Sequence, residues 1–320
     1  MISFTTWPKL RFLLLGVAIL FLGSQPAFSQ DWNITKTQQG IEIKEAGQKV
    51  LFYQTALSTL DGQYPRTNYI HPLYGLNEEI LTEDFPKDHY HHRGVFWTWH
   101  QVWIGDKRIG DAWLCEDITC LVKKTKTKKN KDGSLTIRAD VRWTSPNWTN
   151  KKGKPQDFLK EAVHIAVYPR TGNLRVIDFQ ISLEALVNQL AIGGSEDDKG
   201  YGGFSPRIIT PENIRFTSTN GRVTPENLAV EAGNWMDITG DFMNDNPNSG
   251  IMIINQVATK NSPQKWILRS ELSMQNHVFP GNTQYEIQPD EPLVLNYRLV
   301  LHQNKLGKSQ IEALSHSQDQ

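Results

Sequence analysis

From Ile34 onward, hydrophobic and polar residues alternate with a period of two over many short stretches. This alternation, together with many β-branched residues, is typical of strands that bury one face. Long stretches with a helical period are absent, and turn-forming residues separate the alternating segments. The pattern predicts strands at residues 40–45, 49–55, 95–104, 135–143, 162–168, 174–183, 250–256 and 293–302.

Many strands of similar length with little helix predict an all-β fold, an antiparallel β-sandwich or barrel. The chain has 320 residues, 38% of them hydrophobic, which suits one large core. No internal repeat and no linker rich in Pro, Gly or Ser divides it. We therefore expect one domain over residues 30–310, followed by a C-terminal tail over residues 311–320.

A lysine-rich segment, residues 123–131, is followed by Asp132-Gly133. An Asp-Gly pair between strands favours a tight hairpin turn, and lysines keep such a hairpin in solvent. The formal net charge is zero, because 34 basic residues balance 34 acidic ones. The chain therefore has no overall field that would attract nucleic acid, and we predict no nucleic-acid partner.

Residues 1–29 have the layout of a secretory signal peptide. Lys9 and Arg11 precede an apolar stretch of about eleven residues, and Ala27 and Ser29 suit cleavage before Gln30. This stretch is shorter than the ~20 residues that span a bilayer, and no later segment is long enough. We expect a periplasmic or secreted protein that does not insert into a membrane after the signal is cleaved.

The chain has two cysteines, Cys115 and Cys120. At this spacing on one extended strand they would lie too far apart to bond, so a disulfide would need a turn between them. Their pairing stays open at this point.

Titratable side chains are densest in residues 83–94, around the run Asp-His-Tyr-His-His-Arg at 88–93. If this run is extended, His89, His91 and Arg93 share one face. A neutral imidazole offers one donor and one acceptor nitrogen, which suits acid–base work near neutral pH. The alternative is a polar strand end in which these side chains only satisfy one another. The predicted catalytic residues are Glu83, Asp88, His89, His91, His92 and Arg93.

Histidines at alternate strand positions can also bind a divalent metal ion, although the spacing alone does not complete a ligand set. His89, His91 and His302 are the candidate ligands, and His71 and Glu83 are further ones. No other cofactor is predicted.

Two further groups of residues suit ligand binding. Trp97 and Trp99 lie at alternate positions, and such rings either pack a core or stack on sugar faces. The glycine-rich residues 196–207 form either an exposed turn or a loop that brings a cation, a phenol and a guanidinium to a ligand. The predicted substrate-binding residues are His71, Trp97, Trp99, Lys199, Tyr201, Arg207 and His302.

Four segments carry a resemblance to a known family: residues 69–75, residues 81–94 with their His-His-Arg-Gly, residues 199–204 and residues 297–302. They resemble the bacterial PmoA-like family, catalogued as "methane oxygenase PmoA". That name implies a subunit of a membrane-bound copper monooxygenase, whereas a chain with a cleaved signal and no spanning helix is not an integral membrane subunit. Members look like extracytoplasmic proteins of carbohydrate use, similar in pattern to galactose-mutarotase-like supersandwiches. The resemblance implies a sugar-active protein.

Two functions follow as hypotheses, both with a small-molecule carbohydrate as partner. The first is an epimerase, lyase or hydrolase acting on a sugar or oxidised sugar, with histidines as acid and base, Arg93 and Lys199 beside developing negative charge, and Asp88 orienting an imidazole. The second is a non-catalytic carbohydrate-binding module. The module predicts exposed, coplanar tryptophan rings. The enzyme predicts one concave pocket that gathers His91, His92, Arg93, Lys199 and His302.

Overall fold

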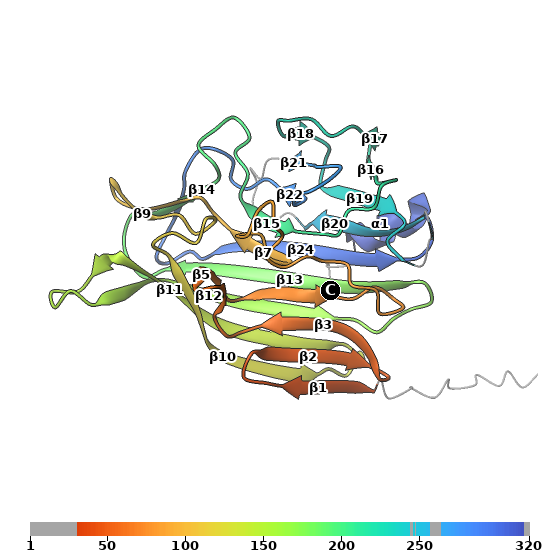
Figure 1. Ribbon diagram of the computed structural model, residues 1–320, viewed down its shortest axis with the longest axis horizontal. Coiled ribbons are helices and arrows are strands. Elements are labelled where there is room, and N and C mark those ends of the chain that lie inside the picture. The colour runs from red at the N-terminus through yellow and green to blue at the C-terminus, as the bar shows by residue number, and fades with distance from the viewer. Residues whose placement is uncertain (1–30, 244–245, 247, 257–263, 317–320) are drawn as a thin grey trace, which may run out of the picture.

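The computed structural model describes residues 31–243, 246, 248–256 and 264–316 (Figure 1). The predicted signal peptide, residues 1–29, and its cleavage site before Gln30 lie outside these residues. All strand pairs in the described residues are antiparallel.

Two large sheets form the body of the molecule. The larger has nine strands, in the order β10 (Thr119–Lys129), β11 (Leu135–Thr149), β12 (Pro155–Val167), β13 (Leu174–Ala185), β24 (Leu293–His302), β20 (Ser249–Asn255), β19 (Trp235–Gly240), β16 (Arg215–Ser218) and β17 (Gly221–Val223). The second has six strands, in the order β1 (Trp32–Lys36), β2 (Gly40–Glu45), β3 (Gln48–Gln54), β6 (Tyr69–Leu73), β7 (Val95–Thr98) and β15 (Gly203–Pro206).

Three small sheets complete the fold. The first has four strands, β23 (Tyr285–Ile287), β14 (Leu190–Gly193), β8 (Gln101–Ile104) and β9 (Lys107–Gly110). The second has three, β18 (Val230–Glu231), β21 (Lys265–Ile267) and β22 (Asn276–His277). The last pairs β4 (Ser58–Leu60) with β5 (Gln63–Arg66). Figure 1 shows β21 and β22 just above β15 and β7 in this view.

Aromatic side chains join the two large sheets. Phe204 of the six-stranded sheet stacks on Tyr297 of the nine-stranded sheet, with ring centroids 4.5 Å apart. Trp97 of the six-stranded sheet contacts Phe179 of the nine-stranded sheet edge to face, with ring centroids 6.2 Å apart. Buried rings contribute large apolar areas and specific pair contacts, so this layer fixes how the sheets sit on one another. The predicted all-β, antiparallel β-sandwich is confirmed.

The lysine-rich segment lies on the edge strand β10, where all five lysines are exposed. Gly133 makes the turn into β11 with φ = +85°, a conformation that favours glycine. Lysines on an edge strand disfavour pairing with another chain, because the unpaired backbone is surrounded by charge. The predicted solvated hairpin is confirmed.

Two segments differ from the sequence prediction. Residues 95–104 form two strands rather than one, because β7 pairs with β15 while β8 pairs with β14 and β9. The C-terminal segment is not an irregular tail throughout, because α1 (Lys308–His316) is helical. Its Ile311 and Leu314 pack on Met252, Ile254 and Val300, which buries one face of the helix against the nine-stranded sheet.

Both cysteines, Cys115 and Cys120, are free thiols, each half-buried. Among the described residues, no helix has the length and apolar character needed to cross a bilayer.

Candidate functional site

The histidine segment, residues 88–92, folds as consecutive turns in the loop between β6 and β7. The amide of His89 donates to the carbonyl of Pro86 at 3.0 Å, and the amide of His92 donates to the carbonyl of His89 at 2.9 Å. A turn brings residues three apart together, whereas an extended strand would separate them. The rings of His89 and His92 therefore stack, with centroids 4.6 Å apart, and His91 stands edge-on to both.

Gly94 allows this loop to return to the sheet. Its φ is +41°, and a Cβ at this position would collide with the carbonyl oxygen of Ile70. Its own amide and carbonyl are bonded to Glu83 and Arg207, at 2.8 and 2.7 Å. The glycine that follows the His-His-Arg run is thus required by close backbone approach.

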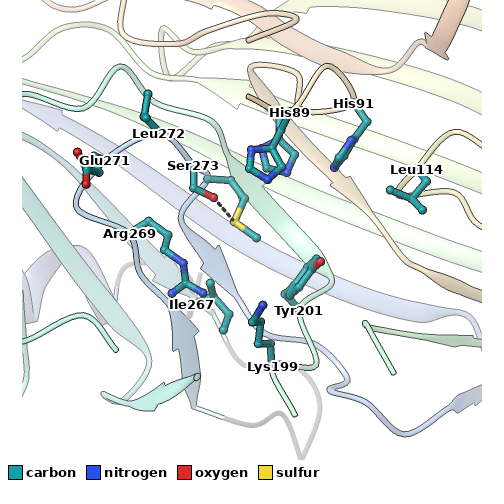
Figure 2. Close-up of a pocket in the computed structure, with 12 residues that line it drawn as sticks. His89, His91, Leu114, Lys199, Tyr201, Ile267, Arg269, Glu271, Leu272 and Ser273 are labelled. Atoms are coloured by element: carbon teal, nitrogen blue, oxygen red, sulfur yellow. Dashed lines mark hydrogen bonds between the residues drawn. The ribbon is translucent and has the colours of Figure 1, made fainter. Parts of the chain in front are cut away.

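The histidines open onto a pocket of about 290 Å³. Four loops build it: the histidine segment, the loop after β9, the loop between β14 and β15, and the loop between β21 and β22. Figure 2 shows His89 and His91 facing Arg269 and Glu271 across the pocket, with Lys199 and Tyr201 at one side. The lining residues are His89, His91, His92, Leu114, Lys199, Tyr201, Ile267, Arg269, Glu271, Leu272, Ser273 and Met274.

Three polar groups in the pocket are available to a ligand. Within the described part of the chain, neither ring nitrogen of His91 nor the hydroxyl of Tyr201 has a hydrogen-bond partner, and the Lys199 ammonium is 3.8 Å from the Asp197 carboxylate. Burial raises the pKa of Tyr201, so its hydroxyl keeps its proton at neutral pH. An acceptor, a donor and a cation therefore face the same hollow.

His91 and His92 are neutral in the folded protein. Burial, reinforced by the positive charge of Arg66, lowers the pKa of His91 to about 3. Burial also lowers the pKa of His92 far below its usual range. Arg207 donates to Nδ1 of His92 at 3.5 Å, so the proton of that ring lies on Nε2.

The lowered pKa of His91 predicts acid sensitivity. The unfolded chain takes up a proton on His91 near pH 6.5, whereas the folded protein does so only near pH 3. The free energy of unfolding should therefore fall as the pH is lowered between these values, by up to about 1.4 kcal/mol per pH unit for this one proton. Urea denaturation at several pH values measures the slope. The variant His91→Asn should show a shallower slope, and an unchanged slope would contradict this origin.

Arg207 is a buried support beneath the histidine segment. Its guanidinium is fully buried, bonds both oxygens of Asp88 at 2.8 and 2.9 Å, and bonds Glu83 at 2.7 Å. Asp88 in turn accepts from Nδ1 of His89 at 2.7 Å. Of the residues predicted to act on substrate, Arg207, Asp88 and Glu83 are thus engaged with one another and do not line this pocket.

Arg93 also points away from the pocket. Its side chain is fully buried, bonds Asp84 and the Tyr69 hydroxyl at 2.5 Å each, and lies over the Phe85 ring. These contacts leave it no approach to a ligand in the pocket. Arg93 thus holds the loop in place and does not contact the pocket.

Trp97 and Trp99 lie in the core and not on a sugar-binding surface. They are 4% and 0% exposed. The indole of Trp97 donates to the buried carboxylate of Glu161, and that of Trp99 donates to the carbonyl of Phe279 at 3.0 Å. Of the two interpretations of these rings, core packing is the one that the structure shows.

His71 and His302 are likewise outside the pocket. Nδ1 of His71 is 3.0 Å from the Thr82 hydroxyl, and burial lowers the pKa of His71. His302 is 1% exposed and bonds the Asp237 carboxylate through Nε2 at 2.9 Å. The structure therefore brings together His89, His91, His92, Lys199 and Tyr201, but neither of these two histidines.

The candidate metal set His89, His91 and His302 does not converge, because His302 is held by Asp237 in the nine-stranded sheet. In the ranges that the structure describes, no group of three or more His, Cys, Asp or Glu side chains is placed to hold a metal ion. Metal binding stays a prediction, which elemental analysis of the purified protein tests.

The sequence prediction missed the wall of the pocket opposite the histidines, which contains Arg269 and Glu271. It also missed His100, whose Nδ1 is 2.9 Å from Asp111 and whose ring lies edge to face against Tyr201 at 5.0 Å. No motif marks these positions. Only the pairing of β21 with β22 and of β8 with β9 brings them to the site.

Two solved structures show a distant similarity to this chain. An alpha-galactosidase from Lactobacillus brevis is similar with a TM-score of 0.40 and 9% identity, over 89% of this chain and 41% of that one. A heparan sulfate lyase mutant from Pedobacter heparinus is similar with a TM-score of 0.39 and 8% identity, over 86% of this chain and 35% of that one. The chain thus spans less than half the length of either enzyme. No curated protein matches the sequence.

The sequence of residues 40–316 matches one family, described as "Family of unknown function (DUF6807)". The matched range begins at β2 and ends with α1, so it includes the nine-stranded sheet, the six-stranded sheet except β1, and every loop of the pocket. The chain belongs to this family of unknown function.

Proposed function

We propose that the pocket binds an acidic sugar and that the protein is an enzyme that moves a proton on it, as an epimerase, a lyase or a hydrolase. One observation carries the proposal: an unpartnered neutral imidazole, His91, shares a pocket with a protonated phenol, Tyr201, and a cation, Lys199. These are the groups that acid–base catalysis requires.

The roles follow from the chemistry of each group. Lys199 and Arg269 favour a negatively charged ligand group, such as the carboxylate of an oxidised sugar. Neutralising a carboxylate makes the proton on the adjacent carbon easier to remove, because negative charge develops on the carboxylate oxygens. In a lyase, His91 accepts that proton, the C–O bond on the next carbon breaks, and Tyr201 donates a proton to the departing oxygen. In an epimerase, Tyr201 instead returns a proton to the carbon from which His91 took one. In a hydrolase, His91 takes a proton from the attacking water while Tyr201 protonates the oxygen of the glycosidic bond that breaks.

The low pKa of His91 in the free pocket is compatible with this role. It keeps the imidazole unprotonated throughout the physiological range. A bound carboxylate would favour the imidazolium form and so raise the pKa of His91 toward neutrality. The base thereby becomes stronger when an acidic ligand is present.

The pocket also suits the apolar face of a sugar ring. Leu114, Ile267 and Met274 lie among its lining residues. Its volume of about 290 Å³ is at the small end of ligand pockets, which begin at about 300 Å³. The resemblance to the PmoA-like family, with its link to carbohydrate use outside the cytoplasm, supports the same substrate class.

The alternative of a non-catalytic module has less support. In the part of the chain that the structure describes, every tryptophan is buried or half-buried. A module that binds sugar by stacking needs exposed rings, whereas the pocket gathers titratable groups.

Binding of glucuronic acid and of glucose, measured by calorimetry, tests the proposal. We expect the acid to bind and Lys199→Gln to weaken its binding about tenfold, because one charge-assisted contact is lost at a partly exposed site. Lys265→Gln, which removes an exposed lysine outside the pocket, is the matched control. Equal binding of the acid and the neutral sugar, or no effect of Lys199→Gln, would contradict recognition of the carboxylate.

A further inference from the structure

A second hollow of about 640 Å³ adjoins the pocket. Two residues, Glu271 and Leu272, line both hollows, so the two are separated only by the tip of the loop between β21 and β22. The other residues around the second hollow are Glu83, Ile209, Thr210, Pro211, Glu212 and Ser270.

The loop between the hollows is held firmly at its base. The side chain of Gln275, which is fully buried, accepts from the amide of Arg269 at 2.9 Å and donates to its carbonyl at 2.8 Å. The Arg269 guanidinium donates to the carbonyls of Glu226 and Asn227 at 2.8 and 2.9 Å. The loop is therefore a fixed ridge between two hollows.

Leu272 lies at the tip of this ridge with 64% of its surface exposed and with φ = +47°. A leucine in the left-handed region is uncommon and strained. Ile209, which also lines the second hollow, is 45% exposed. Exposed apolar side chains that rim a polar hollow are typical of a binding surface.

The two hollows differ in charge. The first contains Lys199 and Arg269 together with the shared Glu271. The second has Glu212, the shared Glu271 and Glu83, which is paired with Arg207 from beneath, and no basic residue is among its described lining residues. Carboxylates accept hydrogen bonds from hydroxyl groups and repel another carboxylate. The second hollow therefore suits an uncharged sugar, with its C–H face on Ile209 and Leu272.

We infer that the substrate is an oligosaccharide in which an acidic sugar fills the histidine pocket and the adjoining neutral sugar fills the second hollow, so that the linkage between them crosses Leu272. This inference rests on the proposed function and specifies its substrate.

Calorimetry with three probes tests it: glucuronic acid, a panel of disaccharides that join glucuronate to glucose, galactose or mannose, and digalacturonate. We expect at least one mixed disaccharide to bind ten or more times more tightly than glucuronic acid, and digalacturonate to show no such gain. Ile209→Ser and Glu212→Ala should abolish the gain and leave the affinity for glucuronic acid unchanged. Glu286→Gln, an exposed position on β23 outside both hollows, is the control.

The outcomes separate the two proposals. If glucuronic acid binds and no mixed disaccharide binds more tightly, the second hollow is not a sugar site and the proposed function stands. An equal gain for digalacturonate would overturn the assignment of a neutral sugar. If the folded protein binds neither glucuronic acid nor any disaccharide, both proposals fail.

Discussion

Replacing His91 by alanine is expected to lower kcat on the acidic sugar about 10²- to 10⁴-fold, the range by which a positioned acid or base accelerates proton transfer. In the described residues, His91 is the pocket imidazole whose two nitrogens are both unengaged, whereas His89 is bonded to Asp88 and His92 to Arg207. The loss should fall on kcat more than on KM, because the proton moves in the transition state and not on binding.

A matched control shows whether the loss of kcat is specific to His91 or follows from removing any half-buried histidine. His164 is half-buried on β12, outside the pocket, and its pKa is also lowered by burial. His164→Ala should leave kcat within about twofold of wild type, since surface-type substitutions away from a site have small effects. Steady-state kinetics and circular dichroism of both variants measure the difference. A His91→Ala protein that folds and turns over at the wild-type rate would remove His91 as the base.

Replacing Glu161 by alanine is expected to destabilise the protein by about 3 kcal/mol or more. Glu161 is fully buried between the large sheets and accepts three hydrogen bonds, from the indoles of Trp97 and Trp143 and from the amide of Asn68, at 2.5 to 2.7 Å. Burial raises the pKa of Glu161, while these donors favour the charged form. Alanine would leave three buried donors without partners and a cavity beside two indoles.

The variant Glu161→Gln separates the loss of one hydrogen bond from the loss of the whole side chain. The amide of Glu161→Gln retains one acceptor oxygen for Trp97 and Asn68 but turns a donor toward Trp143, so we expect a smaller loss of roughly 1–2 kcal/mol. Urea denaturation of wild type, Glu161→Gln and Glu161→Ala measures all three. Equal stability of Glu161→Ala and wild type would mean that water or a side-chain rearrangement satisfies the donors.

Alternation predicts most of the sandwich because a strand with one buried face must place apolar residues at every second position. Residues 40–45 and 293–302 were expected as strands and are β2 and β24. Alternation does not predict that residues 95–104 divide into two strands. The division depends on pairing with β15 and β14, which lie far away in the sequence. The helical α1 was missed since its apolar face is short and is defined by packing on β20 and β24.

The candidate site was predictable where its residues are adjacent in sequence. The histidine segment stands out by composition, and the alternation of its residues suggests an extended strand. The hydrogen bonds that the amides of His89 and His92 donate to the carbonyls of Pro86 and His89 make it a pair of turns instead. The partners of Arg93 and Arg207 are set by long-range contacts that spacing does not reveal. Arg269 and Glu271 lie about 180 residues from the histidines, and neither forms part of a motif.

Arg207 bonds two carboxylates that belong to different hollows. Asp88 bonds His89, which lines the histidine pocket, and Glu83 lines the second hollow. A substitution that shifts this guanidinium would therefore move residues of both hollows at once. The affinities of the two hollows for their parts of a ligand would then change together during evolution. To redesign the specificity of one hollow alone, substitutions should be made at residues that do not contact Arg207.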